Sequence, residues 1–218
     1  EWKLDMVYGE NPEALSDQQT FPDGKVDRLT CCRLLKTEAL VRTLSGEGTR
    51  YRFNHQAGKY EPDTRKEPYT GVIVGLRADE EGSRSKERYF SPRDGRSLWH
   101  VSEQPPEFWN QYNTDAAPGT HVRVHPLLDW TELNIWEYIA REKIPVVPLY
   151  FNQGKGTRYR SLGCHPCTAP VASEARTVDE VVEELASGRY SRVAERAGRA
   201  QDKDDGGGLE TLRRGGYM

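Results

Sequence analysis

The stretch Gly71-Val72-Ile73-Val74-Gly75-Leu76 indicates the fold class of this chain. Its apolar run is continuous and β-branched, which is typical of a strand buried inside a parallel sheet. A densely charged segment, residues 77–88, follows it directly. Because ligands of open α/β sheets bind beyond the carboxyl ends of the strands, this segment stands where a functional site is expected.

Other segments predict strands and helices in alternation, and therefore an α/β layered domain with a mainly parallel sheet. Residues 46–69 are polar and rich in glycine and proline, and we expect an irregular loop there. We assign residues 1–200 to the domain and residues 201–218 to a flexible tether and tail. The expected strands are residues 4–9, 71–76 and 122–124, and the expected helices are residues 31–45, one opening at Asp129-Trp130-Thr131-Glu132 and one opening at Thr177-Val178-Asp179-Glu180.

Composition excludes several classes of protein. The chain has 218 residues and a mean hydropathy of -0.84, and no apolar run is long enough to span a membrane. A net charge of -3 and a pI near 6.0 give no overall basic surface, so contact with DNA would need a local basic patch. The first residue is Glu1, and no secretory leader follows it, so we expect a cytoplasmic protein.

All four cysteines occur in two close pairs, Cys31-Cys32 and the C-x-x-C of Cys164 and Cys167. Four thiolates suit a [4Fe-4S] cluster or a structural zinc ion. Adjacent cysteines fit a zinc knuckle poorly, so we favour the cluster, and a redox disulfide or inert buried thiols remain as alternatives. His165 lies between Cys164 and Cys167, where we expect it to shape the turn.

The charged segment carries basic and acidic side chains in alternation. One interpretation is a solvated surface crossed by salt bridges. The other is a clamp for an oxyanion or phosphate, because guanidinium groups bind such anions bidentately, and the acidic neighbours would orient the arginines or hold a nucleotide through Mg²⁺. No known phosphate-loop motif is present, so the residues alone do not establish nucleotide binding. The basic residues are Arg77, Arg84, Lys86 and Arg88, and the acidic ones are Asp79, Glu80, Glu81 and Glu87.

Several stretches resemble the small subunit of bacterial sulfate adenylyltransferase. They keep that family's order from about residue 30 to the end of the chain. The resemblance implies membership of the phosphoadenylyl-sulfate reductase and ATP pyrophosphatase superfamily. It further implies an adenine nucleotide alpha hydrolase-like fold, cleavage of ATP between its α and β phosphates, and a phosphate-loop unit upstream of Glu1. The stretches are residues 75–88, 35–40, 130–136 and 160–164, and the tail Arg213-Arg214-Gly215-Gly216-Tyr217.

The cysteines depart from that subunit. Cys31-Cys32 with Lys36, together with Cys164-His165-Pro166-Cys167, resembles the [4Fe-4S] pattern of adenylyl-sulfate reductases. Those reductases need a catalytic cysteine in the tail, and the end of this chain, residues 215–218, has none. The combination is similar to the ATP pyrophosphatase component of DNA phosphorothioation systems.

We therefore expect an ATP-dependent adenylyltransferase of sulfur metabolism that activates a DNA backbone phosphate for sulfur incorporation. The first alternative is a sulfate adenylyltransferase subunit with a GTPase partner; an adenylyl-sulfate reductase or a non-catalytic, metal-stabilised binding module ranks lower. Expected ligands and partners are ATP, Mg²⁺, the [4Fe-4S] cluster, a sulfur donor such as a cysteine desulfurase, DNA, and further subunits of an oligomer. The expected site residues are catalytic Arg77, Arg84 and Arg88, nucleotide-binding Lys36, Gly75, Glu81 and Lys86, and metal-binding Cys31, Cys32, Cys164 and Cys167.

Overall fold

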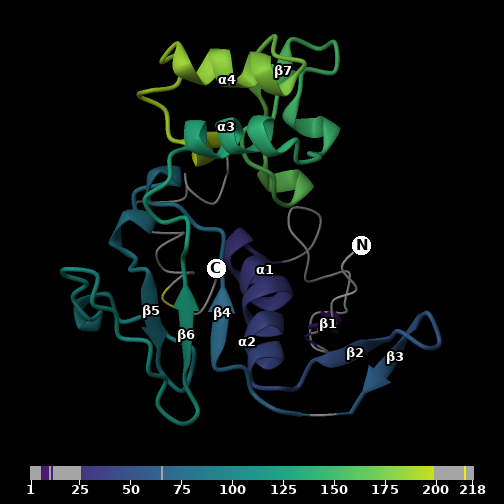
Figure 1. The fold of residues 1–218 in the computed structure, drawn as a ribbon, viewed down its shortest axis with the longest axis vertical. Coiled ribbons are helices and arrows are strands. Elements are labelled where there is room, and N and C mark those ends of the chain that lie inside the picture. The colour runs from purple at the N-terminus through teal and green to yellow at the C-terminus, as the bar shows by residue number, and fades with distance from the viewer. Residues whose placement is uncertain (1–5, 10, 12–25, 65, 199–213, 215–218) are drawn as a thin grey trace. The chain divides into compact units, whose positions relative to one another are not determined.

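The computed structural model describes residues 6–9, 11, 26–64, 66–198 and 214 (Figure 1). The chain divides into two compact units, between which it passes more than once. The first unit comprises residues 1–74, 90–124 and 210–218, and the second comprises residues 75–89 and 125–209. Among the described residues, no helix has both the length and the apolar content needed to cross a membrane.

A single helical run crosses the first unit from Arg28 to Leu44. It consists of α1 (Arg28–Cys32), the π-helical segment η3 (Arg33–Thr37) and α2 (Glu38–Leu44). The Asp27 carboxylate caps its start by accepting from the Thr30 backbone N–H at 2.9 Å, and Gly46, at φ +89°, follows its end. The helix predicted for residues 31–45 is thus confirmed, although it begins three residues earlier because Asp27 provides the cap.

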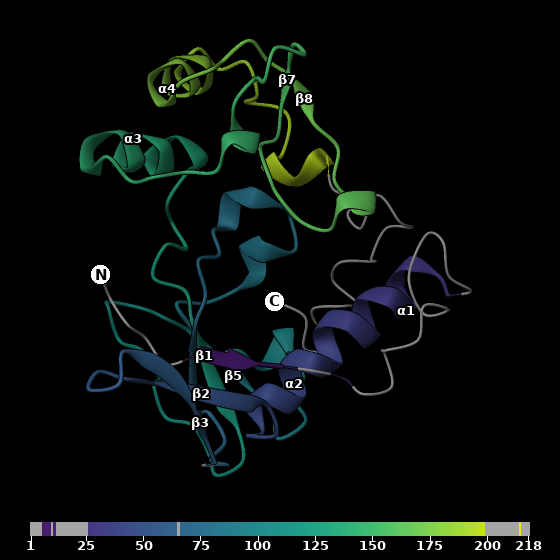
Figure 2. The same ribbon diagram turned by 90° about the vertical axis from the view of Figure 1, so that its right-hand side faces the viewer.

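The prediction of an irregular loop over residues 46–69 is wrong. This stretch forms a hairpin of β2 (Thr49–Asn54) and β3 (Lys59–Asp63), and β1 (Met6–Tyr8) pairs with β2 on its other side (Figure 2). All pairings in this sheet are antiparallel. Phe53 and Tyr60 face each other across the hairpin with their ring centroids 5.1 Å apart, so cross-strand aromatic packing stabilises a segment that its glycines and prolines made look irregular.

A second sheet in the first unit has the order β4-β6-β5 (Figure 1). β4 (Gly71–Ile73) runs parallel to β6 (His121–Val124), and β5 (Phe90–Arg93) runs antiparallel to β6. The predicted strand at residues 71–76 exists, but it is shorter, and the prediction that it is buried is wrong. Ile73 is 79% exposed on β4, which lies at the edge of this sheet, whereas the central strand β6 is buried from His121 to Arg123.

The α/β class is confirmed. The β4–β6 pairing is parallel, as expected, while the other strand pairings among the described residues are antiparallel. The second unit contributes the short antiparallel pair of β7 (Thr157–Arg158) and β8 (Val171–Ala172). The predicted tether and tail lie outside the described residues, apart from Arg214, so the domain boundary near residue 200 stays a prediction.

Two amphipathic helices form the core of the second unit. α3 (Glu132–Glu142) packs against α4 (Val178–Ala186), as Figure 2 shows. Trp136 and Val181 are buried between them, and the ring of Tyr150 meets Trp136 edge-on at 5.7 Å. Short 3-10 turns make up the other helical elements of the described residues: η4 (Ala78–Glu80), η5 (Arg84–Lys86), η7 (Pro148–Tyr150), η8 (His165–Cys167) and η9 (Glu195–Gly198) in this unit, and η6 (Val101–Glu103) in the first unit.

Both predicted helix starts are close to the observed ones. Thr177 caps α4 as expected, since its hydroxyl accepts from the Glu180 N–H. α3 is capped by Thr131, in a capping box with Asn134, rather than by Asp129. The Asp129 carboxylate instead accepts a hydrogen bond of 2.9 Å from the Tyr89 hydroxyl.

Candidate functional site

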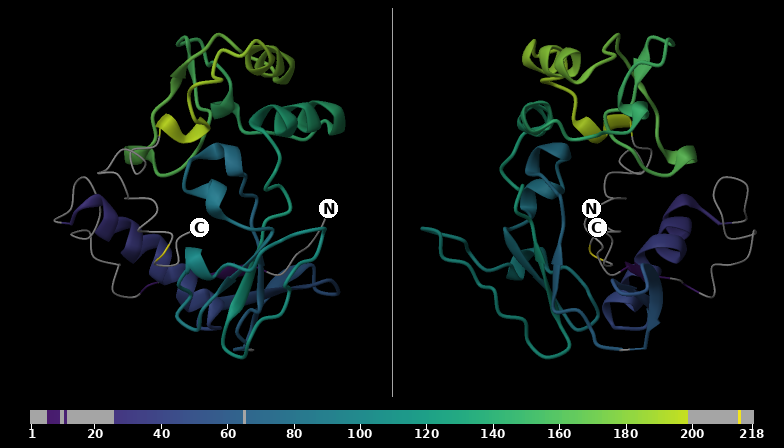
Figure 3. Two further views of the ribbon diagram at one scale, coloured as in Figure 1. Left: turned by 90° about the vertical axis from the view of Figure 1, so that its left-hand side faces the viewer. Right: turned by 45° about the vertical axis from the view of Figure 1, so that its right-hand side comes forward.

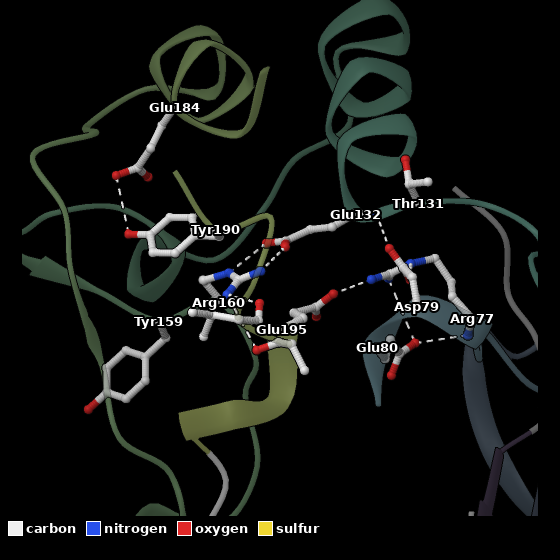
Figure 4. Close-up of polar contacts among 12 residues, drawn as sticks. Arg77, Asp79, Glu80, Thr131, Glu132, Tyr159, Arg160, Glu184, Tyr190 and Glu195 are labelled. Atoms are coloured by element: carbon white, nitrogen blue, oxygen red, sulfur yellow. Dashed lines mark hydrogen bonds and ion pairs between the residues drawn. The ribbon is translucent and has the colours of Figure 1, made fainter. Parts of the chain in front are cut away.

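The charged segment after β4 folds into η4 and η5 in the second unit, and its arginines are buried among carboxylates. The Arg77 backbone N–H donates to Glu80 Oε1 at 3.0 Å, which closes the η4 turn. The Arg77 guanidinium contacts Asp79 Oδ1 at 2.9 Å and also pairs with Glu195, a residue 118 positions later (Figure 4). Arg77 therefore joins the charged segment to η9.

Arg84 belongs to the same cluster. Its guanidinium lies 2.9 Å from Glu80 Oε2, and Glu80 Oε1 lies 3.7 Å from Arg77, so both arginines share one buried carboxylate. Both arginines are only 7% exposed. The interpretation of the segment as a solvated surface is thus excluded for these two side chains, which instead form a buried ion-pair cluster.

A second buried ion pair lies beside the first, at the start of α3. Asp79 Oδ2 accepts from the Glu132 backbone N–H at 2.7 Å, and the Glu132 carboxylate pairs with Arg160 at 2.5 Å. Arg160 also donates to the Val193 carbonyl at 3.0 Å, and its guanidinium stacks 4.3 Å from the centre of the Tyr190 ring (Figure 4). Arg160 thereby connects α3 to the segment that precedes η9.

Glu184 on α4 is the centre of a third group. It accepts from the Arg158 guanidinium and from the Ser173 hydroxyl, each at 2.9 Å, and it pairs with Arg189 at 3.0 Å. Arg158 is only 1% exposed. Charged side chains this deeply buried persist only when they are paired, so these contacts are structural requirements of the second unit.

Burial shifts the titration of this cluster. Burial raises the pKa of Glu195 to about 7, and the nearby carboxylates Glu132 and Glu80 act in the same direction, against the opposing effect of Arg77. The carboxylates around Arg77 in turn raise the pKa of its guanidinium despite burial. Near neutral pH, Glu195 is therefore partly protonated while Arg77 stays charged.

A cavity of about 380 Å³ in the second unit opens onto this cluster. Polar and apolar side chains line it, and its buried cation, Arg160, is already paired with the Glu132 carboxylate. An anion that bound to Arg160 would have to compete with the Glu132 carboxylate. The charged and aromatic lining residues are Asp79, Glu132, Arg160, Tyr190, Arg192 and Glu195.

The other predicted residues in and next to the charged segment differ from Arg77 and Arg84 in burial and in their contacts. Arg88 is half-buried, with its guanidinium 3.3 Å from the Glu87 carbonyl, and Lys86 and Gly75 are exposed. Glu81 accepts from the Ser83 N–H at 2.8 Å and also from its hydroxyl. Gly75, Glu81, Lys86 and Arg88 thus belong to one continuous segment of the second unit.

Lys36 lies in the first unit, inside the π-helical segment η3. Insertions of this kind occur frequently at functional sites. Two neighbours in the same segment, Arg33 and Thr37, line a cavity of about 380 Å³ within that unit.

The four cysteines are divided between the units. Cys31 and Cys32 lie in α1 of the first unit, and Cys164 and Cys167 begin and end a turn in the second, closed by a Cys167 N–H bond to the Cys164 carbonyl at 3.0 Å. Such a turn suits two thiolates that share one metal centre. Among the described residues, no three His, Cys, Asp or Glu side chains are grouped as a metal site, and the arrangement of all four cysteines stays a prediction.

Several charged residues that form the ion pairs of the second unit were not predicted from the sequence. Glu132, Arg158, Arg160, Glu184 and Glu195 were not singled out as site residues. Glu132 and Arg160 do fall inside stretches that carry the family resemblance, and that position was a usable signal. Glu195 and Glu184 had no such signal, because their partners are distant in the chain.

Comparison with known proteins defines the class to which this chain belongs. Residues 3–170 match the phosphoadenosine phosphosulfate reductase domain family. The chain is a member of that family, and the expected superfamily is confirmed.

Its relatives narrow the class. The chain is 36% identical to sulfate adenylyltransferase subunit 2 of Akkermansia muciniphila over 99% of this chain and 72% of the relative. It is also 36% identical to the protein of that name from Allorhizobium ampelinum, over 100% of this chain and 70% of the relative. The subunit from Brucella ovis is 39% identical over 69% of this chain and 58% of its own length. The predicted resemblance to sulfate adenylyltransferase subunits is thereby confirmed.

Proposed function

We propose that this chain is the subunit of a sulfate adenylyltransferase that transfers the adenylyl group of ATP to sulfate, and that it works with a GTPase subunit. The observation that carries the proposal is the 36% identity to subunits of that name along virtually the whole chain. Those relatives support sulfate as the acceptor more strongly than a DNA phosphate. We therefore favour sulfate over a DNA phosphate as the acceptor, whereas the sequence alone favoured the DNA phosphate.

In the proposed reaction, a sulfate oxygen attacks the α-phosphorus of ATP. The bond from that phosphorus to the oxygen bridging to the β-phosphate breaks, and pyrophosphate leaves with that oxygen and its electron pair. Negative charge builds on the α-phosphoryl oxygens during the attack, and nearby guanidinium and ammonium groups stabilise it.

We assign the residues of the charged segment to anion contact or to positioning according to how deeply they are buried. Arg88 and the exposed Lys86 are the side chains that we assign to direct contact with the anions, and Glu81 would hold the nucleotide through Mg²⁺. Arg77 and Arg84 are buried and paired with Glu80, so we assign them to positioning the segment rather than to contact with ATP. Lys36 and Gly75 stay proposed nucleotide-binding residues.

We further propose that the four cysteines hold a [4Fe-4S] cluster. Two adjacent cysteines in α1 and a C-x-x-C turn at η8 supply the thiolate donors that such a cluster requires. Bound there, the cluster would crosslink two distant parts of the chain.

The same cysteine pattern favours a second candidate, activation of a DNA backbone phosphate for sulfur incorporation from a cysteine desulfurase. Adenylylation would convert a phosphate oxygen into a leaving group that a sulfur nucleophile displaces. The two candidates share the attack on ATP and differ only in the acceptor.

A pyrophosphate-release assay tests both. The protein, purified without oxygen, is incubated with ATP and Mg²⁺ plus sulfate, with and without the GTPase subunit and GTP, or plus duplex DNA. We expect release that depends on sulfate and on the GTPase subunit. Arg88→Ala should lower the rate about 100-fold, whereas Arg176→Ala, which removes an exposed arginine elsewhere in the same unit, should not change it.

Release that depends on DNA and ignores sulfate would replace the first candidate with the second. Failure to turn over ATP with any acceptor would refute both candidates.

A further inference from the structure

A loop of the first unit exposes three large aromatic side chains. We call residues 104–118, which lie between η6 and β6, the aromatic loop; it extends from the β4-β6-β5 sheet (Figure 3). Phe108 is 64% exposed, Trp109 is 90% exposed and Tyr112 is 41% exposed. Clustered exposed aromatic residues of this kind are typical of protein–protein interfaces.

The base of the aromatic loop is fastened to β5. Glu107 Oε1 accepts from the Phe90 backbone N–H at 2.8 Å, and Gln104 Oε1 accepts from the Ser91 hydroxyl at 2.5 Å. The rings of Phe90 and Tyr112 lie 5.2 Å apart. The loop therefore presents Phe108 and Trp109 from a defined support on the sheet.

The tip of the aromatic loop holds a strained backbone. The Gln111 N–H donates to the Phe108 carbonyl at 2.9 Å, and the two residues inside this turn, Trp109 and Asn110, have φ of +51° and +59°. The left-handed region costs a residue with a side chain about 1–2 kcal/mol. Because Trp109 is both strained and almost fully exposed, its side chain contributes little to the stability of the isolated chain. Strain retained at such a position points to a role outside the fold.

Charge limits the class of partner. Residues 102–120 contain Glu103, Glu107 and Asp115 but no lysine or arginine. An acidic loop repels nucleic acid and anionic lipid, and it attracts a surface with lysine or arginine at its rim. Tryptophan at the centre of such a contact is the residue type that most often dominates the binding free energy.

We propose that the aromatic loop is the docking surface for the partner subunit of this enzyme, and that Trp109 inserts into an apolar pocket rimmed by basic residues on that subunit. This inference rests on the proposed function, which supplies the need for a partner. It adds the surface, the central residue and the chemistry of the complementary pocket.

The test measures the Kd for the GTPase subunit from the same organism by isothermal titration calorimetry, using the whole purified protein. Trp109→Gly should weaken binding at least about 30-fold, the effect of losing a central tryptophan. Because glycine adopts a positive φ readily, the urea midpoint of Trp109→Gly should be no lower than that of the wild type, which separates lost binding from lost folding. Glu103→Lys should weaken binding mainly at low salt. Leu149→Ser, at a residue 51% exposed in the second unit, is the matched control and should leave Kd unchanged.

The outcomes distinguish failure of the docking inference from failure of the proposed function. If the wild type binds the GTPase subunit and Trp109→Gly binds equally well, the docking surface is wrong while the proposed function stands. The inference is also overturned if the loop variants instead abolish self-association of this chain or its binding to duplex DNA. If the protein forms adenylyl sulfate fully without a partner, the docking inference falls together with the proposed need for a GTPase subunit, while transfer to sulfate stands. If it neither binds the GTPase subunit nor uses sulfate, the docking inference and the proposed function both fall.

Discussion

Glu195 should make the stability of this protein fall as pH rises from about 4.5 to 7. Burial raises the pKa of this carboxyl to about 7, against an ordinary value of 4.5. A raised pKa in the folded chain means that the folded chain holds a proton that the unfolded chain releases, so the stabilisation is complete below pH 4.5 and is lost as pH passes 7. At about 1.36 kcal/mol per pH unit, the difference between 4.5 and 7 corresponds to at most about 3 kcal/mol.

Glu195→Gln isolates this effect because glutamine copies the protonated carboxyl at every pH. Arg77 keeps two other carboxylates, Asp79 and Glu80, in the variant. We expect the variant and the wild type to unfold with similar free energies at pH 5, and the variant to gain on the wild type by up to about 3 kcal/mol at pH 8.

Urea unfolding, followed by tryptophan fluorescence at intervals between pH 5 and pH 8, measures the difference. Glu183→Gln removes an exposed carboxylate from α4 and serves as the control, for which the difference from the wild type should not change with pH. Curves of free energy against pH that run parallel for Glu195→Gln and the wild type would refute the assignment of a shifted, buried carboxyl.

Three further changes follow from the same structure. Arg160→Met should destabilise the protein by about 3–5 kcal/mol in urea unfolding because it leaves the Glu132 carboxylate buried without its partner, and a smaller loss in the single variant than in Arg160→Met/Glu132→Leu would contradict this. Burial lowers the pKa of His121 to about 4 from 6.5, so stability should fall as pH drops from 6.5 towards 4, and His121→Gln should flatten that decline in urea midpoints taken at pH 7 and pH 5. Cys164→Ala should abolish the brown colour and the bound iron and sulfide of protein purified without oxygen; a colourless wild type would count against the cluster.

Local signals in the sequence predicted the helices well and the sheets less well. Thr177 marked the start of α4 because a capping hydroxyl acts within a few residues. The burial of β4 could not be predicted in this way. A β-branched run has the same composition at the centre of a sheet and at its edge, and only the tertiary structure shows that β4 is an edge strand and that Ile73 is exposed.

The candidate site likewise contains residues that local sequence signals predicted and residues that they did not. Residues 77–88 could be singled out because their charge density and their position after a strand are visible in the chain itself. Arg77 pairs with Glu195 and Arg160 pairs with Glu132, and in each pair the two residues are far apart in the sequence. Pattern analysis identifies charged residues, but only tertiary structure shows whether a charge is already neutralised.

Whether a basic side chain is already paired with a buried carboxylate affects how strongly it can bind a phosphate in the proposed reaction. A guanidinium with buried carboxylate partners at hydrogen-bonding distance gains less from a phosphate than an exposed one, because binding the phosphate would leave a buried carboxylate without its partner. Arg77 and Arg84 are in that position, whereas Lys86 is exposed on the same short segment. The buried ion pairs thus hold the segment in one conformation, and the cation that we propose to meet the anion is Lys86, which is exposed on that segment.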